Sequence, residues 1–276
     1  MRLQDYGVGI FSRVPTKSAL KKALKKQQIT VNNSIASTAT FISGGETIRL
    51  TMLDDKVISK KKLIFKLKVL FEDDYLAVVR KPAGVLVSGN KFKTIANALS
   101  QNLKPSILTT ITAPQPVHRL DYATTGVLLV GKTSNSIYAL NKLFENKEIK
   151  KTYYAVTIGN MKPGRTISTT IDGKASQSDY QILESVPSKR FNILNLVKLE
   201  PKTGRRHQLR KHLSSIGNPI LGDMMYGKEN LILKGKGLYL HAYSLKFIHP
   251  FTNEKIYVKA ELPKRFTKIF VSNIIE

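Results

Sequence analysis

The spacing of apolar residues predicts both strands and helices in this chain. A continuous apolar run at 127–130 predicts a buried strand, because it has no polar face to present to water. Residues 134–147 instead repeat apolar positions at helical spacing, on a face made of Ile137, Leu140, Leu143 and Phe144. Through 161–200, short apolar and polar runs alternate. They predict an antiparallel meander with turns at Pro163-Gly164, Asp172-Gly173 and Pro187-Ser188.

A separate small module is predicted for residues 1–55. Pro15-Thr16 is a favourable helix start, and the helix that follows has one apolar face and one lysine face. The lysine face consists of Lys21, Lys22, Lys25 and Lys26. Alternating Ile29 and Val31, an Asn32-Asn33 turn and a strand over 46–52 complete the module. From these residues alone, the lysines are also consistent with an ordinary solvated face.

A basic linker over 56–68 is predicted between this module and a larger domain at 69–276. The linker shows little apolar periodicity and contains Lys56, Lys60, Lys61, Lys62, Lys66 and Lys68. A lysine-rich segment of this kind suits the backbone of an RNA strand.

Charge is the most informative part of the composition. The 276 residues contain 45 Lys and Arg against 19 Asp and Glu, which gives a formal net charge of +26. Such a surface binds polyanions, because neutralising phosphates releases their condensed counterions. RNA or DNA is the expected partner, and an anionic membrane surface is the weaker alternative.

Several function classes are excluded by what the sequence lacks. It has no cysteine, which rules out disulfides, thiolate zinc sites and cysteine nucleophiles. It has no P-loop or dinucleotide-binding glycine motif. No apolar run reaches the roughly 18 residues of a membrane helix, and the N-terminus does not resemble a signal peptide. We expect a cytoplasmic monomer that uses no membrane, metal or cofactor.

The stretch at 117–133, VHRLDYATTGVLLVGKT, places a single carboxylate at the entrance of the predicted central strand. Asp121 follows His118 and Arg119, and a polar turn at 123–126 separates it from the strand. Catalytic groups often lie on such loops, which a rigid scaffold holds in place. For Arg-Leu-Asp alone, a turn-capping aspartate paired with Arg119 is the simpler interpretation.

A second charged stretch, PKTGRRHQLRKHLSSIGNPILGDMMYG, occupies 201–227. It predicts a Thr203-Gly204 turn and then a basic helix that carries Arg205, Arg206, His207, Arg210, Lys211 and His212. Read alone, this helix would bind phosphates. His207 and His212 are five positions apart and lack the i,i+4 spacing of a helical metal pair, so no metal site is predicted.

Together these stretches resemble the motifs of the RluA family of RNA pseudouridine synthases. The similar elements are HRLD with its Thr-Gly turn and apolar strand, Lys151-Thr152-Tyr153, and TGR-x-HQ-L-R-x-H-L with the later GD-x-x-YG. Lys81-Pro82-Ala83-Gly84 resembles the opening of the family's catalytic domain. Three positions differ from the usual pattern: Val87-Ser88-Gly89 replaces a His-Pro pair, Arg206 replaces a threonine and Asn218 a histidine. The N-terminal module resembles the alpha-L type of RNA-binding module.

The resemblance implies an α+β pseudouridine synthase fold with a central mixed, largely antiparallel sheet, plus a small α/β N-terminal RNA-binding module. It also implies an isomerase that converts specific uridines to pseudouridine without a cofactor, in ribosomal or transfer RNA processing. Asp121 would be the catalytic residue. Whether its carboxylate attacks the anomeric carbon or removes the neighbouring ribose proton stays open.

The same resemblance implies substrate-binding roles. Arg210 would lie beside Asp121 and keep it ionised, and Arg119 would fill the place of the flipped nucleotide. Tyr153 would stack on the extruded uracil, with Leu209 as an apolar wall. RNA-binding residues would be Lys21, Lys22, Lys25, Lys26, Arg205 and Arg206. The alternatives are a single-carboxylate RNA glycosidase or nuclease, and a non-catalytic RNA-binding or ribosome-assembly protein on the same scaffold.

Overall fold

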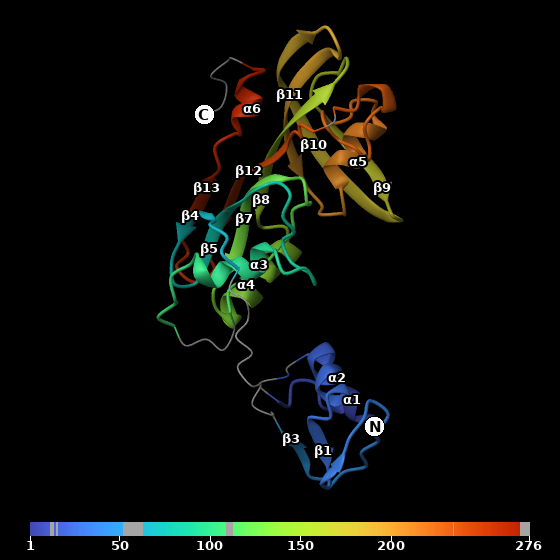
Figure 1. The fold of residues 1–276 in the computed structure, drawn as a ribbon, viewed down its shortest axis with the longest axis vertical. Coiled ribbons are helices and arrows are strands. Elements are labelled where there is room, and N and C mark those ends of the chain that lie inside the picture. Colours follow the sequence, from blue (N-terminus) through green and yellow to red (C-terminus); the bar gives the residue numbers. More distant parts are fainter. Residues whose placement is uncertain (12–13, 15, 52–62, 109–112, 234, 271–276) are drawn as a thin grey trace. The chain divides into compact units, whose positions relative to one another are not determined.

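A computed structural model describes residues 1–11, 14, 16–51, 63–108, 113–233 and 235–270. The chain divides into two compact units, Met1–Lys62 and Leu63–Glu276 (Figure 1). Most of the predicted linker, residues 56–62 of 56–68, lies outside the described residues. The predicted boundaries at 55 and 69 therefore stay predictions.

The N-terminal unit packs two helices and a small sheet around one core. Thr16 caps helix α2 (Lys17–Lys25) by accepting a hydrogen bond from the Ala19 amide, as expected of an N-cap threonine. Asn32 and Asn33 both have positive φ, which asparagine tolerates, and they turn β1 (Ile29–Val31) back into β2 (Ser34–Ile35). Helix α1 (Leu3–Tyr6) and strand β3 (Ile48–Leu50) complete the unit, whose sheet order is β2-β1-β3.

The second unit is built on a ten-stranded sheet of order β4-β5-β7-β12-β8-β11-β10-β9 (Figure 1). Outside this order, β13 pairs with β12 and β6 pairs with β7. The described pairings in this sheet are antiparallel except β7 with β12, which confirms the predicted mixed, largely antiparallel sheet. The strands are β4 (Lys68–Glu72), β5 (Leu76–Lys81), β6 (Gln115–Pro116), β7 (Thr125–Gly131), β8 (Lys150–Ile158), β9 (Arg165–Ile171), β10 (Lys174–Ser188), β11 (Asn192–Pro201), β12 (Leu240–Ile248) and β13 (Lys255–Lys259).

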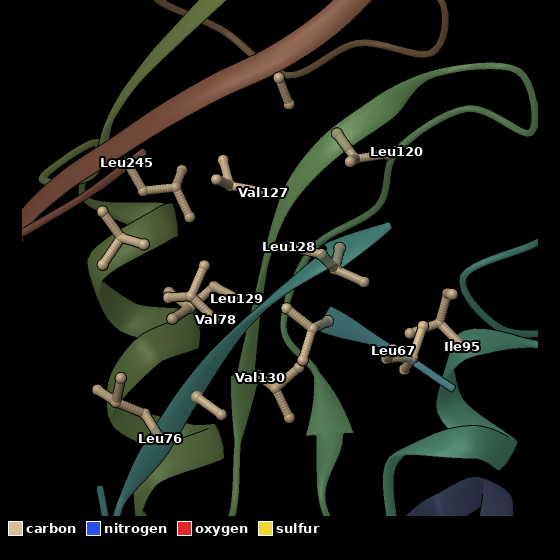
Figure 2. Packing of buried hydrophobic residues seen from close by; sticks show 14 of the residues in the cluster. Leu67, Leu76, Val78, Ile95, Leu120, Val127, Leu128, Leu129, Val130 and Leu245 are labelled. Atoms are coloured by element: carbon tan, nitrogen blue, oxygen red, sulfur yellow. The ribbon is translucent and has the colours of Figure 1, made fainter. Parts of the chain in front are cut away.

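The neighbouring strands β5 and β7 contribute to one of two large apolar clusters. Figure 2 shows Leu76 and Val78 of β5 beside Leu128, Leu129 and Val130 of β7, all fully buried. A glycine is required where β7 runs parallel to β12. Gly126 has φ 120°, and a Cβ atom there would collide with the Ala242 carbonyl. The Thr-Gly turn of the 117–133 stretch thus lets β7 enter the middle of the sheet.

Short helices flank this sheet. Helix α3 (Ile95–Ala98) and the 3-10 turn η1 (Leu99–Gln101) follow β5, and α4 (Ser134–Glu145) follows β7. Thr133 and Ser136 form a reciprocal capping box at the start of α4. Helix α5 (Gln208–Ser215) packs beside β9, β10 and β11, and η2 (Glu229–Leu231) and α6 (Lys264–Thr267) lie further along the chain (Figure 1).

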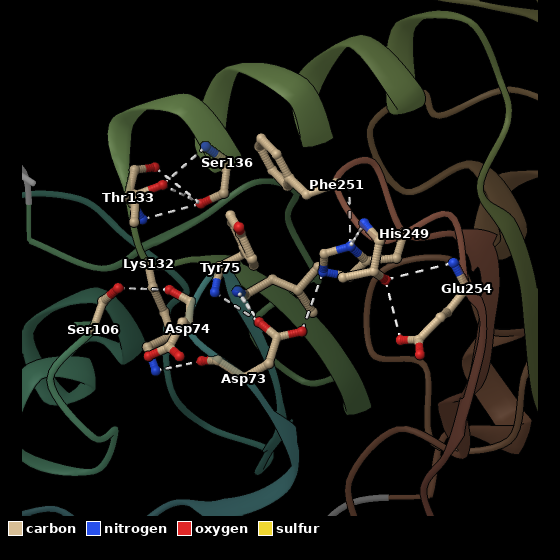
Figure 3. Close-up of polar contacts among 12 residues, drawn as sticks. Asp73, Asp74, Tyr75, Ser106, Lys132, Thr133, Ser136, His249, Phe251 and Glu254 are labelled. Atoms are coloured by element: carbon tan, nitrogen blue, oxygen red, sulfur yellow. Dashed lines mark hydrogen bonds and ion pairs between the residues drawn. The ribbon is translucent and has the colours of Figure 1, made fainter. Parts of the chain in front are cut away.

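A polar cluster joins the turn after β4 to the turn between β12 and β13 (Figure 3). One Asp73 oxygen accepts hydrogen bonds from the Tyr75 and Leu76 amides, and the other lies 3.1 Å from His249 Nε2. His249 Nδ1 accepts from the Phe251 and Thr252 amides. The Asp73 carboxylate and the His249 imidazole therefore satisfy backbone amides of the two turns and stabilise them.

Two local predictions were wrong. The turn predicted at Pro187-Ser188 lies further along the chain, at 189–191, since β10 continues through Ser188, which pairs with Asn192 of β11. Strand β9 covers β10 only from Lys174 to Tyr180, so Pro187 lies where β10 has a free edge and no further ladder needs its missing N–H. The helix expected to carry Arg205 to His207 begins later, at Gln208.

Candidate active site

A cleft of about 890 Å³ brings together the residues predicted for the site in the second unit. Its walls come from the loop before β7, from β8, and from the segment between β11 and α5. The predicted residues that line it are Arg119, Asp121, Tyr153, Arg205, Arg206, Leu209 and Arg210. The predicted RNA-binding lysines Lys21, Lys22, Lys25 and Lys26 are exposed in the N-terminal unit, on α2 and its C-cap.

The loop that carries Asp121 is anchored through the backbone carbonyls that follow the aspartate. The buried Lys81 ammonium donates hydrogen bonds to the carbonyls of Pro82, Tyr122 and Thr124 at 3.0, 3.2 and 2.8 Å. The Gly84 amide donates to the same Tyr122 carbonyl. Burial lowers the Lys81 pKa to about 8, and the negative charge of Asp121 opposes this shift. Lys81 therefore fixes the backbone immediately after the candidate catalytic carboxylate.

Asp121 lies between two nitrogen donors. Arg210 Nη1 is 3.6 Å from its Oδ2 atom, and His207 Nε2 is 3.7 Å from its Oδ1 atom. The Asp121 side chain keeps 25% of its surface exposed, so it opens into the cleft. Both oxygens thus have a neighbour that stabilises negative charge, while one face of the carboxylate remains accessible to a substrate.

Arg210 is held by a second carboxylate. Its Nε and Nη2 atoms each lie 2.8 Å from an oxygen of Asp223, in a bidentate pair that is almost fully buried. Burial lowers the Arg210 pKa, but the hydrogen bonds and charge of Asp223, together with Asp121, outweigh it and raise the pKa overall. The guanidinium also lies over the Tyr226 ring at 4.9 Å. Arg210 is therefore a fixed positive charge beside Asp121.

Tyr153 forms a half-buried wall of the cleft. Burial raises the pKa of its phenol well above the usual range, and the negative charge of Asp121 adds to the shift. The phenol is therefore neutral at physiological pH. The next residue, Tyr154, points to the opposite face of β8 and packs edge-on against Tyr243, as strand alternation predicts.

The rim of the cleft is basic and exposed. Arg119, Arg205 and Arg206 are all exposed there, and lysines of three other segments also line the cleft, namely Lys147, Lys151 and Lys202. Among the described residues, no group of three or more His, Cys, Asp or Glu could hold a metal ion. None of the described helices is long and apolar enough to cross a membrane.

The basic segment at 205–212 is only partly exposed to solvent. Arg210 and His212 are buried, and the two His212 ring nitrogens lie 2.8 and 3.0 Å from the hydroxyls of Ser176 and Ser178. The interpretation of a phosphate-binding helix was therefore wrong for this inner face. For Arg205 and Arg206, which precede the helix and are exposed, it stays a prediction.

Four residues of the site had no role in the sequence-based prediction: Lys81, His207, Gln208 and Asp223. The buried Gln208 amide accepts from Thr203 Oγ1 and the Arg205 amide and donates to Gln177 O and Ser178 Oγ, so it fixes the turn before α5. His207 was considered only as part of the basic helix and as half of a metal pair. The signal that could have identified His207, Gln208 and Asp223 is their place inside the stretch at 201–227, to which Lys81 does not belong.

Comparison with known proteins agrees with this geometry. Residues 75–215 match the family model for RNA pseudouridylate synthase. Ribosomal large subunit pseudouridine synthase C of Rickettsia felis is 32% identical, over 93% of this chain and 92% of that protein. Synthase D of Nitrosomonas europaea is 30% identical, over 90% and 77%. The solved structure of Human RNA Pseudouridylate Synthase Domain Containing 1 gives a TM-score of 0.60 at 25% identity, over 71% of this chain and 84% of that chain.

These matches confirm the predicted family and the pseudouridine synthase fold, while the RNA-binding role of the N-terminal module stays a prediction. They span the cleft, the strand that follows Asp121 and helix α5 with its buried arginine. The enzyme class follows from the family, since its members isomerise uridine in RNA. The chain therefore belongs to the RNA pseudouridylate synthase family and is an RNA pseudouridine synthase.

Proposed function

We propose that this enzyme converts uridine to pseudouridine in large-subunit ribosomal RNA, with Asp121 as the catalytic carboxylate. The observation that carries the proposal is the placement of Asp121 in an open cleft between Arg210 and His207. The target RNA is supported by relatives that are named ribosomal large subunit pseudouridine synthases. Transfer RNA is the alternative target.

The isomerisation requires only bond exchange at the ribose. The bond between uracil N1 and ribose C1′ breaks, a bond from uracil C5 to C1′ forms, and the C5 proton is lost while N1 gains one. No net oxidation or reduction occurs. Asp121 either attacks C1′ and is later displaced by C5, or removes the C2′ proton and returns it when C5 attacks C1′. Both routes require an ionised carboxylate facing the ribose.

Arg210 favours that ionised form. Its positive charge lies 3.6 Å from Asp121, and the pair with Asp223 prevents it from swinging away. Removing Arg210 would leave Asp121 with His207 as its one neighbouring donor. The arginine is thus proposed to set the protonation state of the carboxylate and not to react itself.

The walls of the cleft suit an extruded base. Tyr153 and Leu209 present an aromatic ring and an apolar side chain to the cleft, and a planar uracil can stack between such surfaces. Arg119 is exposed at the same opening, where it can take the place of the flipped nucleotide in the RNA stack. Arg205 and Arg206, with the lysines of α2, are proposed to contact phosphates.

Mapping pseudouridine in total RNA from cells with and without this protein tests the function. Loss of one or more sites in large-subunit ribosomal RNA is expected. The sites should return when the parent protein is restored and should stay absent with Asp121→Asn. Sites lost only from transfer RNA would contradict the proposed target, and unchanged RNA would contradict the proposed function.

A further inference from the structure

His207 bridges the candidate catalytic carboxylate and a tyrosine. Its Nε2 atom lies 3.7 Å from Asp121 Oδ1, and its Nδ1 atom lies 2.9 Å from the Tyr226 hydroxyl. The imidazole and the Tyr226 ring meet edge to face, with centroids 5.7 Å apart. Two separate parts of the molecule, the loop that carries Asp121 and the turn after Asp223, therefore converge on one imidazole.

The backbone of His207 adopts a conformation that is uncommon for residues other than glycine. It has φ 56° and ψ 24°, the left-handed conformation, at the N-cap of α5. Histidine has a Cβ atom and adopts this region at an energetic cost, and such conformations often occur at functional sites. Gln208, with its four hydrogen bonds, holds the turn in place. The strained conformation aims the ring at Asp121.

The two contacts together select one tautomer. A carboxylate favours an N–H group over a lone pair on the nitrogen that faces it, so Nε2 carries the proton. Nδ1 is then an acceptor, and the Tyr226 hydroxyl donates to it. Burial lowers the pKa of His207, and the positive charges of Arg210 and Arg206 lower it further. The negative charges of Asp121 and Asp223 raise it, but the net shift is downward, so the ring is neutral near pH 7.

We propose that His207, oriented by Tyr226, is a positioning residue that holds a neutral N–H donor against the Asp121 carboxylate. The proposal rests on the proposed function of Asp121. Arg210 faces one oxygen of the carboxylate and His207 faces the other, so the two donors fix its plane and favour its ionised form. Because a neutral donor adds no charge, it stabilises the carboxylate without repelling the nearby Arg210.

Two substitutions distinguish the donor from the backbone. In His207→Gln the terminal amide nitrogen reaches the place of Nε2 and can donate to Asp121. In His207→Asn the shorter amide reaches only the place of Nδ1, so the donor is lost, yet asparagine tolerates the left-handed conformation best among such residues. If the N–H donor matters, glutamine should be the better replacement. If only the backbone conformation matters, asparagine should be.

Two measurements on the full-length protein test the proposal. First, NMR of carboxyl-labelled aspartate follows the Asp121 titration without RNA, with Asp121→Asn identifying its signal. In His207→Asn the midpoint should move up by about one pH unit, which corresponds to a tenfold weaker preference for the ionised form. In His207→Gln it should stay within a few tenths of a unit of the parent. An unmoved midpoint in His207→Asn would overturn the proposal even if the parent isomerises RNA as expected.

Second, single-turnover isomerisation of a substrate RNA is measured across pH. The acid limb of the rate profile should move upward with His207→Asn and not with His207→Gln. A uniform loss of rate at every pH in both variants, or a faster Asn than Gln variant, would show that His207 acts only through the backbone. If the parent itself does not isomerise RNA, the proposed function fails, and the Asp121 titration still tests the role of His207.

Discussion

Arg210 Nη1 lies 3.6 Å from Asp121 Oδ2, at a distance fixed by the bidentate pair that the other two guanidinium nitrogens make with Asp223. The arginine is therefore oriented before any substrate arrives, and its contact with Asp121 is the longer of its two carboxylate contacts. A pre-oriented charge needs little rearrangement when RNA binds, which is how electrostatic stabilisation is most effective in an active site.

Replacing Arg210 should change the pH dependence of the reaction. Arg210→Met retains the stem volume and removes the charge, so isomerisation should be slow at neutral pH and partly recover as pH rises and Asp121 ionises. Arg210→Lys should be intermediate, because it retains the charge but loses the planar bidentate contact. Single-turnover rates across pH measure this. Arg205→Met and Arg206→Met are the controls. If one of these variants shifts the pH profile and Arg210→Met does not, then Arg210 is not the arginine that keeps Asp121 ionised.

Asp223 should matter for stability as well as for rate. Asp223→Ala leaves the buried Arg210 guanidinium without its bidentate partner, and breaking a buried pair in this way costs about 3–5 kcal/mol of unfolding free energy. Denaturant unfolding measures the change. Glu145→Ala is the control, because it removes a 3.0 Å ion pair with Lys142 on the exposed face of α4, where alanine suits the helix. Equal losses in the two variants would mean that the buried pair contributes no more than a surface pair.

Lys81 should give the enzyme a specific dependence of stability on pH. Its pKa is about 8 in the folded protein against 10.5 in the unfolded chain. Between these values the unfolded state binds more protons than the folded state, so the stability of the parent should rise with pH. Lys81→Met should lack that increment when unfolding free energies are compared from pH 7.5 to 10. Parallel curves for parent and variant would show that burial does not lower the pKa of Lys81.

The lysine face of α2 should contribute to RNA affinity through phosphates. Changing Lys21, Lys22, Lys25 and Lys26 to glutamine should weaken binding and make log affinity less steep against log salt, by roughly 0.7 per lost contact to single-stranded RNA. Titrations at several salt concentrations measure the slope. The same change at four exposed lysines of the other unit, Lys246, Lys255, Lys259 and Lys264, is the control. An unchanged slope in the α2 variant would identify its lysines as an ordinary solvated face.

Two central elements of the fold could be predicted from the sequence. The apolar run at 127–130 became buried strand β7, and the amphipathic pattern at 134–147 became α4, because both depend on local periodicity. Pro187 misled the prediction, since its position on a free edge of β10 depends on where β9 ends. That information is tertiary and leaves no local pattern.

The site likewise contains residues that the sequence identified and residues that it did not. Asp121, Tyr153 and Arg210 were found through long motifs, and the structure brings them to one cleft. The role of Lys81 left no such signal, because a buried lysine and a surface lysine look identical in sequence and its acceptors are backbone carbonyls. Asp223 and Tyr226 act on Arg210 and His207 across a turn whose geometry the spacing alone did not specify.

Asp121→Asn is the most direct test of the account. The substitution retains the size of the side chain and removes its charge and nucleophilicity, so neither attack at C1′ nor removal of the C2′ proton remains possible. In a single-turnover assay on a substrate RNA, pseudouridine formation should be undetectable, while RNA affinity should change by less than about tenfold, or 1.4 kcal/mol. Substantial pseudouridine formation by Asp121→Asn would contradict the assignment of Asp121 as the catalytic residue.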